Sequence, residues 1–455
     1  MLPTYALLKT RLKAILFDKK QQGFDTKAAL AQFKSLPDDY QVLDEFARSL
    51  EHLNYRSDWP YAEPDALDDI LRACDVTDAQ QVKQWQQRIP HDLTKRIETG
   101  FLGSVCGCIL GKPIEVDPTL AQLKTAAQPL NQWPINDYIS RDLLDALGAR
   151  HEQWRETIRE NISYVAIDDD INYTLMGMLI LEQFGDNFTA NDIRQLWLKH
   201  LPVATTFGPE RTVLTKAAID WISEQAPKID RVHSWGKNWN PGSELCGALI
   251  RADAYGYAYA GDPLAAAKAA YTDAAFTHVK TGVYATMFVA AAIAAAPIAD
   301  TALDIFKIAL KFVPTRSRFH EVVHDSLNKI ENAENWEQGY QAIHGKYKDY
   351  THCAIYQEIG TLINSLHFAK DVGSAICIQV SQGNDTDSFG ATCGAIAGMY
   401  FGETGLDEKW LSPFNDKIYS GLAGFTEQSL TAVAKRVSNL PSRVNNQPKI
   451  ISNSK

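Results

Sequence analysis

Residues 383–398 read Gly-Asn-Asp-Thr-Asp-Ser-Phe-Gly-Ala-Thr-Cys-Gly-Ala-Ile-Ala-Gly, and this stretch carries two signals. The hard oxygen ligands of residues 385–388 stand where a helix is expected to begin. Gly390, Gly394 and Gly398 then follow at four-residue intervals, which places them on one face of that helix. Each glycine costs roughly 1 kcal/mol in a helix interior. The stretch therefore predicts a helix that another helix approaches closely, with the Asp385 end near other elements.

A second acidic cluster, Asp168-Asp169-Asp170, precedes an apolar rhythm that ends at Gly185 and predicts another helix. Its carboxylates would lie in the first turn, where free N–H groups and the helix dipole favour anions. Two carboxylates about 4 Å apart repel by roughly 4 kcal/mol at an effective dielectric near 20, so five converging ones need a cation. Oxygen ligands favour Mg²⁺, Mn²⁺ or Ca²⁺ over zinc. The alternative is that both clusters are solvated helix N-caps.

Composition indicates a globular protein whose main partner is not nucleic acid. The chain has 455 residues, 45% of them hydrophobic, and a formal net charge of −10. Seven scattered cysteines without a CxxC pair favour reduced, cytosolic thiols. No secretion signal is recognised, and the apolar stretch 283–299 is too short for a membrane span, so we expect a buried helix there and a cytoplasmic protein with no membrane partner.

The predicted fold class is all-α. Strand signals are nearly absent, and helical patterns recur at 213–225, 264–275, 283–296, 301–312, 317–331 and 390–401. Residues 1–90 are expected to form a helical N-terminal extension. Its aromatic and proline-rich loop 56–64 is either a packed connector or a lid over a site. Residues 438–455 are expected to form a loose C-terminal tail.

A third segment, Gly-Ser-Val-Cys-Gly-Cys-Ile-Leu-Gly-Lys-Pro-Ile-Glu at residues 103–115, completes a pattern with the two acidic clusters. Together they resemble the ADP-ribosylglycohydrolase family, whose members share an early Gly-rich helix ending in Gly-x-Pro-x-Glu, a middle Thr-Asp-Asp motif and a late Gly-Gly-Asp-Thr-Asp-Thr motif. The resemblance covers roughly residues 93–435. It implies a compact orthogonal helical bundle, with the catalytic domain at 91–437.

The resemblance also implies the site. Two metal ions, usually Mg²⁺ in the family and with Mn²⁺ as a second option, would coordinate the ribose hydroxyls of ADP-ribose and a bridging water. Asp387 and Glu115 are the implied catalytic residues, with a proton-transfer or gating role for Glu115; the alternative for Glu115 is a surface carboxylate at a helix end. The implied metal ligands are Asp168, Asp169, Asp170, Asp385, Asp387 and Ser388.

Further segments resemble substrate-binding parts of the family. Gly208 resembles the glycine of a loop that lies near the diphosphate in relatives. Gly247 lies within Cys-Gly-Ala-Leu-Ile-Arg, and His278 follows a threonine, as in substrate-binding segments of the family. Asn384 of the late motif is assigned to the substrate as well. A buried structural histidine is the alternative for His278.

Three positions depart from the family pattern. Asp168 replaces the usual Thr and adds a charge. Asn384 replaces a glycine, which is tolerable because Asn also visits left-handed backbone conformations. Cys108 replaces an acidic residue common in the first motif. Because the essential carboxylates remain, an active enzyme is favoured, and the three departures together indicate a divergent branch with an altered substrate preference.

The implied function is a dimetal hydrolase that cleaves the N- or O-glycosidic bond of ADP-ribose attached to a protein side chain or a small acceptor. One alternative is a catalytically silenced ADP-ribose-binding or structural protein on the same scaffold. A minor alternative is a zinc metallopeptidase that uses His320, Glu321 and His324, which form a literal H-E-x-x-H but lack the later histidine of the extended motif. The acceptor and the oligomeric state stay open.

Overall fold

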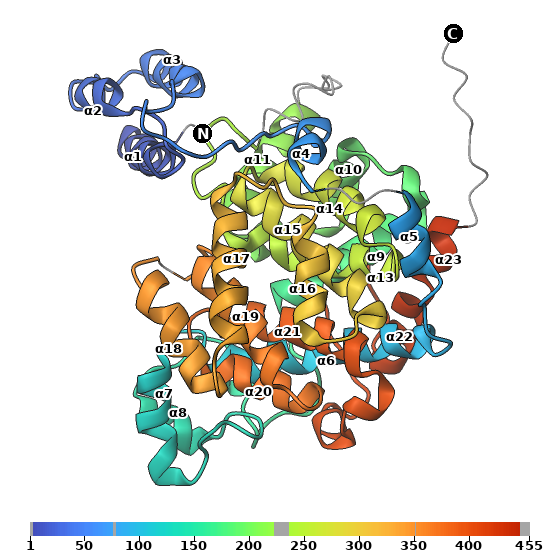
Figure 1. Ribbon diagram of the computed structural model, residues 1–455. Coiled ribbons are helices and arrows are strands. Elements are labelled where there is room, and N and C mark those ends of the chain that lie inside the picture. The colour runs from blue at the N-terminus through green and yellow to red at the C-terminus, as the bar shows by residue number, and fades with distance from the viewer. Residues whose placement is uncertain (1–2, 76–78, 223–235, 351, 446–455) are drawn as a thin grey trace.

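The computed structural model describes residues 3–75, 79–222, 236–350 and 352–445. Within these ranges the chain is helical, and β-pairing is confined to isolated bridges such as the one between Thr119 and Gly383. The predicted all-α class is therefore confirmed (Figure 1).

The helices are joined by connections of unequal length, and the segments 148–168 and 402–429 are the longest of the fully described ones. Their bounds are α1 (Tyr5–Gln21), α2 (Lys27–Phe33), α3 (Tyr40–Ser49), α4 (Leu67–Ala73), α5 (Ala79–Gln86), α6 (Leu93–Gly111), α7 (Leu120–Ala127), α8 (Arg141–Leu147), α9 (Asp169–Phe184), α10 (Ala190–His200), α11 (Gly208–Ile222), α13 (Asp253–Ala258), α14 (Pro263–Thr277), α15 (Thr281–Ala295), α16 (Ala302–Leu310), α17 (Arg318–Glu331), α18 (Trp336–Tyr347), α19 (Tyr356–Phe368), α20 (Val372–Ser381), α21 (Thr386–Phe401), α22 (Leu430–Ser438) and α23 (Leu440–Asn445). The end of the predicted helix 213–225 lies outside the described residues.

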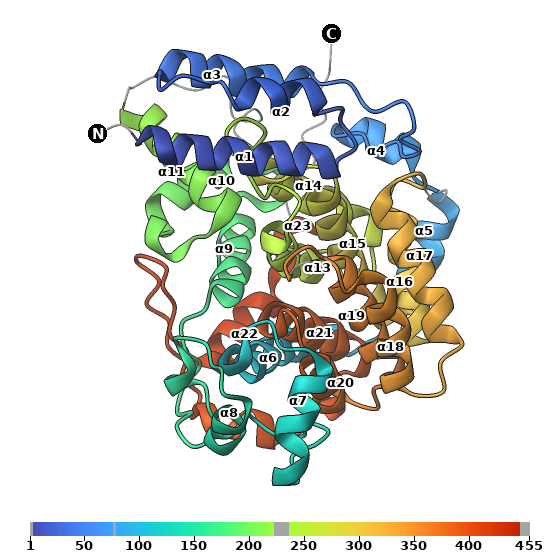
Figure 2. The ribbon, with the colours of Figure 1, turned by 90° about the vertical axis from the view of Figure 1, so that its left-hand side faces the viewer.

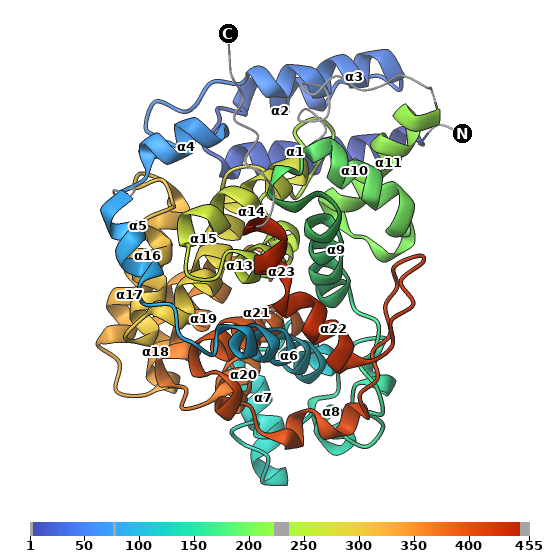
Figure 3. The same ribbon diagram turned by 90° about the vertical axis from the view of Figure 1, so that its right-hand side faces the viewer.

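Helices α6 and α21 pack closely along their length at the centre of the molecule (Figure 3). A Cβ atom added at Gly107 would lie 1.9 Å from the backbone oxygen of Gly390, and one added at Gly394 would lie 2.0 Å from that of Gly103. Real Cβ atoms do not approach backbone this closely, so glycine is required on both faces. The close approach predicted from the glycine spacing is confirmed, and it brings the end of α6 beside the start of α21.

The helix predicted after the first acidic cluster is α9. It begins beside Asp168, whose carboxylate accepts a hydrogen bond from the backbone N–H of Asp170 at 2.9 Å, and it ends at Gly185 as expected. The apolar stretch predicted as a buried helix is α15, which continues into a short 3₁₀ turn (η8, Ala296–Ile298). Residues 281–298 are long and apolar enough to cross a membrane, yet 94% of them are buried inside the molecule, as in the core helix of a globular protein.

The N-terminal extension has a small core of its own. Leu12, Leu43 and Phe46 of α1 and α3 are buried against one another, and Figure 2 shows α1–α3 as a layer across one end of the molecule. The loop at 56–64 is fastened to the main body, because Glu63 pairs with Arg318 at 2.8 Å. These contacts favour the connector interpretation of that loop. The predicted tail from 438 falls partly on α23, where Leu440 is buried, and otherwise lies outside the described residues.

Candidate metal centre

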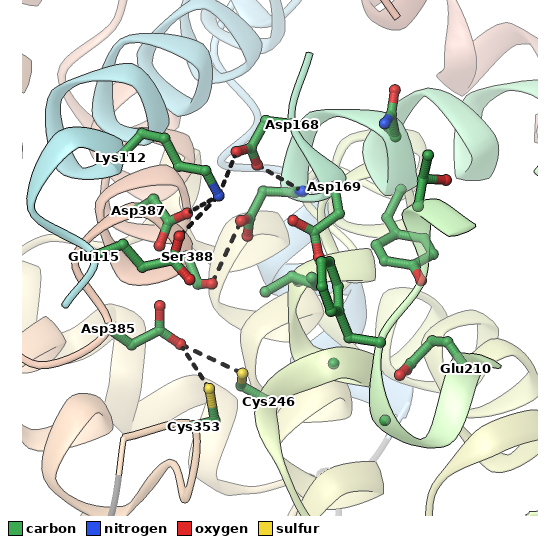
Figure 4. A pocket seen from close by; sticks show the side chains of 18 of the residues that line it. Lys112, Glu115, Asp168, Asp169, Glu210, Cys246, Cys353, Asp385, Asp387 and Ser388 are labelled. Carbon is green, nitrogen blue, oxygen red and sulfur yellow. Dashed lines mark hydrogen bonds and ion pairs between the residues drawn. The ribbon is translucent and has the colours of Figure 1, made fainter. Parts of the chain in front are cut away.

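A cavity of about 490 Å³ opens where several helix ends meet, and most of the predicted site residues line it (Figure 4). Its walls come from the turn after α6, the start of α9, the start of α11, the 3₁₀ helix η7 (Cys246–Arg251), the loop before α19 and the start of α21. The lining includes Glu115, Asp168, Asp169, Asp170, Gly208, Gly247, Asp385, Asp387 and Ser388. The fold therefore brings together two acidic clusters that are far apart in the sequence.

The start of α21 is shaped by a turn that needs left-handed backbone. Gly383 and Asn384 have φ values of +79° and +61°, and the Asn384 N–H donates to the carbonyl of Pro118 at 2.8 Å. Asn tolerates this conformation better than most residues, as expected from the sequence. The turn leaves Asp385 at the helix end, with its side chain free of any capping hydrogen bond and directed into the cavity (Figure 4). Backbone geometry thus places the carboxylate of Asp385, one of the predicted ligands, at the cavity.

Lys112 lies inside the acidic cluster. Its Nζ is 2.8 Å from one carboxylate oxygen of each of Glu115, Asp168 and Asp387, and the residue is only 5% exposed. It occupies the 3₁₀ turn η2 (Lys112–Ile114) that continues α6. The sequence alone did not mark Lys112 as a site residue. Its position beside Asp168 and Asp387 depends on the packing of α6 against α21 and α9, so no local signal identifies it.

The carboxylates are crowded, and their pKa values reflect this. Burial and the neighbouring Asp168 charge raise the pKa of Asp169 to about 7, and burial with the Asp168 and Asp387 charges raises that of Asp170 well above its usual range. Burial and Cys353 likewise raise the pKa of Asp385. Burial also acts on Asp387, but the Lys112 ammonium together with side-chain hydrogen bonds to Glu115, Lys112 and Asp385 lowers the pKa of that carboxyl. One lysine ammonium therefore compensates only part of the negative charge of these carboxylates.

The residues fit a divalent cation. Asp170 Oδ1 and Asp387 Oδ1 are buried carboxylate oxygens with no hydrogen-bond partner among the described residues. Ser388 Oγ lies 3.4 Å from Asp170 Oδ2, so a neutral oxygen ligand borders the same space. Buried polar atoms normally have partners, and unpaired carboxylate oxygens facing a cavity are the donor set that hard cations take. Solvated helix caps, the alternative interpretation, would be exposed rather than buried.

Glu115 lies at the cavity wall, with its side chain 29% exposed and one oxygen held by Lys112. His151 Nε2 is 3.6 Å from the same oxygen. Burial and the charge of Asp387 raise the pKa of Glu115 to about 9. Glu115 is therefore not the free surface carboxylate of the alternative interpretation, and it can present a carboxyl group to whatever the cavity binds.

The predicted substrate-binding residues divide into two groups. Gly208 and Gly247 line the cavity, and Gly208 has φ +37° with open space where a Cβ atom would lie. His278 and Asn384 are not among the lining residues. His278 is 1% exposed and its Nδ1 lies 2.7 Å from Thr277 Oγ1, which agrees with the structural alternative for this histidine. Asn384 affects the site through its left-handed backbone, which shapes the turn before Asp385.

Behind Gly247, a buried ion-pair network supports the cavity floor. Arg251 is 1% exposed and pairs with Glu210 at 2.6 Å and with Asp273 at 2.5 Å. A Cβ atom at Gly247 would lie 2.7 Å from the Glu210 carboxylate, so glycine is needed here for the close approach of that side chain. The network fixes η7 against α11 and α14, and with them one wall of the cavity.

Two cysteine side chains join the cluster at its far end. Cys246 Sγ and Cys353 Sγ lie 3.4 Å and 3.5 Å from the same oxygen, Oδ2 of Asp385. In the sequence Cys246 stands out only as the neighbour of Gly247, and Cys353 was not recognised because it belongs to no motif. The third departure, Cys108, is buried with its sulfur close to the carboxylates of Asp168 and Asp170.

The H-E-x-x-H segment lies on α17, away from the cavity. The rings of His320 and His324 are stacked with centroids 6.4 Å apart, and Glu321 accepts a hydrogen bond from Tyr61 at 2.8 Å. Within the described ranges, no group of three close metal-ligand side chains includes either histidine. A third zinc ligand is thus lacking there, and the structure gives the peptidase alternative no support.

The comparisons with known proteins agree with this fold. A sequence model of the ADP-ribosylglycohydrolase family matches residues 89–445, and the chain belongs to that family. A solved structure described as an ADP-ribosylglycohydrolase-related protein complex has a similar fold, with a TM-score of 0.50 and 16% sequence identity over 78% of this chain and 99% of the other. Among curated proteins, none matches the chain.

Proposed function

We propose that this protein is a divalent-metal-dependent hydrolase that cleaves the N- or O-glycosidic bond joining ADP-ribose to a protein side chain or a small acceptor. The observation that carries the proposal is the pair of unpartnered buried oxygens, Asp170 Oδ1 and Asp387 Oδ1, at a cavity that also presents Glu115. Family membership supports the class of substrate.

The proposed ligands are the six oxygen donors predicted from the sequence, and Mg²⁺ is the expected ion, with Mn²⁺ as a substitute. When bound, such ions acidify a coordinated water and stabilise negative charge. The ligand set consists of Asp168, Asp169, Asp170, Asp385, Asp387 and Ser388.

The protein's own residues supply orientation and proton transfer. Lys112 holds the carboxylates of Glu115 and Asp387 in fixed positions through contacts of 2.8 Å. Glu115 Oε is the group that we assign to proton transfer, because it borders the cavity while its partner oxygen is restrained. Ordered carboxylates at a closed-off cavity floor favour one orientation of a bound ribose over others.

A panel of defined ADP-ribosyl linkages tests the proposal. Arginine, serine, nucleobase and small-metabolite linkages are incubated with the protein in Mg²⁺, Mn²⁺ or EDTA, and released ADP-ribose is measured. We expect metal-dependent release from at least one linkage, and loss of it in Asp387→Ala with the circular dichroism spectrum unchanged. Full activity of Asp387→Ala would contradict the assignment.

A second candidate function is an ADP-ribose-binding protein without turnover. The observation that favours it is Lys112, since its ammonium lies between Asp168 and Asp387, two of the predicted metal ligands. Calorimetric binding of ADP-ribose, combined with no release from any linkage in the panel, would support this function over hydrolysis.

A further inference from the structure

Three potential metal-ligand atoms converge at the end of the cavity opposite Lys112. Cys246 Sγ, Cys353 Sγ and Asp385 Oδ2 all lie within 4.8 Å of one another (Figure 4). The two cysteines are 107 positions apart (353 minus 246), so the fold alone brings them together. Both thiols point at one carboxylate oxygen rather than at separate acceptors.

The distances match those of a tetrahedral site. Zinc lies about 2.3 Å from cysteine sulfur and about 2.0–2.2 Å from carboxylate oxygen, so tetrahedral angles place sulfur and oxygen about 3.6 Å apart. The observed separations of Cys246 and Cys353 from Asp385 are 3.4 Å and 3.5 Å. A cation could therefore be held by these three side chains without a change in the backbone.

The backbone restrains the two cysteines independently of their side chains. The N–H of Cys246 donates to the carbonyl of Cys353 at 2.9 Å, which ties η7 to the loop before α19. Cys353 has φ +63° and Ile355 has φ +74°, conformations that non-glycine residues adopt at an energetic cost. Preformed ligand positions of this kind lower the entropic cost of binding an ion.

Charge also favours a cation at this end. None of the ion pairs among the described residues includes the buried Asp385, whereas the neighbouring Glu358 carboxylate is stabilised by backbone hydrogen bonds and by the charge of His352. Lys112 is engaged with Asp168, Asp387 and Glu115 instead. Buried carboxylates without a compensating charge are costly, and a bound divalent cation would remove that cost.

We propose that Cys246, Cys353 and Asp385 bind one thiophilic divalent cation of the Zn²⁺ class, with its fourth position open to the cavity. Thiolate ligands select such ions over Mg²⁺, and three protein ligands with an open position are the pattern of catalytic zinc. Binding of the ion does not depend on the proposed function, whereas a role for it in turnover rests on that function.

Cobalt substitution tests the site directly. Co²⁺ is added to anaerobically reduced full-length protein, and absorption by thiolate-to-cobalt charge transfer is followed together with metal content. We expect one equivalent of Co²⁺ with thiolate ligation, displaced by Zn²⁺ and not by excess Mg²⁺. Zn²⁺ should also protect Cys246 and Cys353, but not Cys74, from alkylation, a readout that needs no variant.

Cysteine variants identify the ligands. Substitution of groups that only orient a metal ligand commonly costs 10–100-fold in affinity, so Cys246→Ser and Cys353→Ser should each weaken Co²⁺ binding by at least about that factor. Cys377→Ser is the matched control, because Cys377 is buried on α20 and does not line the cavity. Its Co²⁺ affinity should equal that of the wild type.

Three results would overturn the proposal: Co²⁺ binding without charge-transfer absorption, binding unaffected by both cysteine variants, or a disulfide between Cys246 and Cys353 that persists in reduced, metal-loaded protein. The linkage panel is run in parallel. Thiolate-bound Co²⁺ without ADP-ribose release would reject the proposed function alone, and Mg²⁺-dependent release without thiolate-bound Co²⁺ would reject this inference alone.

Discussion

Replacing Lys112 by methionine removes a cation from the centre of the acidic cluster. The residue is 5% exposed, and its Nζ lies 2.8 Å from each of Glu115, Asp168 and Asp387. Removing one partner of a buried ion pair costs about 3–5 kcal/mol, because the remaining charge is buried without compensation. In EDTA, we expect Lys112→Met to lower the free energy of unfolding by about this amount, measured by urea denaturation.

Divalent metal should reverse much of this loss. The substitution frees space beside the carboxylates, and a ligand present at 100 times its Kd adds about 2.7 kcal/mol of stability when it binds only the folded state. We therefore expect Mn²⁺ to raise the urea midpoint of Lys112→Met by more than it raises that of the wild type. The difference between these two shifts in urea midpoint measures how far the divalent cation replaces the lost lysine ammonium.

The control is Lys124→Met, which breaks a partly exposed pair with Glu337 and should cost about 0–1 kcal/mol. The double variant Asp168→Thr with Lys112→Met removes the partner carboxylate and keeps a residue that can cap α9, so it should recover about 0.5–3 kcal/mol relative to Lys112→Met alone. If Lys112→Met costs no more than Lys124→Met in EDTA, the reasoning about buried charge is refuted.

Three further predictions address other parts of the molecule. Gly107→Val should lower the free energy of unfolding by at least about 3 kcal/mol, at the upper end of the cost of overpacking, because backbone atoms block the new side chain. Gly345→Ala should raise it by roughly 0.5–1 kcal/mol, because the space beside Gly345 is open. Equal urea midpoints of the two variants would contradict this. Burial raises the pKa of Asp253 to about 7 in the folded state, so the free energy of unfolding should fall as pH rises from about 4 to 7. Asp253→Asn should flatten this pH dependence and stabilise the protein at pH 8 by at most about 4 kcal/mol. A pH profile of stability unchanged from that of the wild type would contradict this. Arg318→Met should expose the loop at 56–64 to limited proteolysis by removing its pairing with Glu63, without changing KM for an ADP-ribosyl substrate; a raised KM would instead indicate that the extension acts as a lid.

The helix framework was predictable because its signals are local. The spacing of Gly390, Gly394 and Gly398 predicted a closely packed helix, and the contacts of Gly107 and Gly394 with the opposite backbone confirm it. The start of α9 at its acidic cluster and its end at Gly185 also follow from capping preferences that act within one turn. Residue spacing and capping signals together therefore located the two helix starts that carry the carboxylates.

The remaining parts of the site depend on contacts between distant segments. Lys112 follows an ordinary glycine-rich helix, and only the packing of that helix against α21 places its ammonium beside Asp387, 275 positions away. Cys353 stands in a loop whose left-handed backbone has no clear sequence signal at a cysteine. His278 was assigned to the substrate by resemblance, yet it packs beneath the cavity with Thr277, which a linear motif does not distinguish from a lining position.

Asp168 and Lys112 are best understood as a unit. Threonine, the usual family residue at position 168, can cap a helix as aspartate does, so capping of α9 does not require the carboxylate. What the carboxylate adds is a buried charge, and Lys112 Nζ lies 2.8 Å from it. Because the same ammonium also holds Glu115 and Asp387, the pair orients two further carboxylates before any ion binds. The departure at Asp168 therefore preorganises the acidic cluster through a protein cation, and a metal bound at the proposed site would need to order only the ligands that Lys112 leaves free.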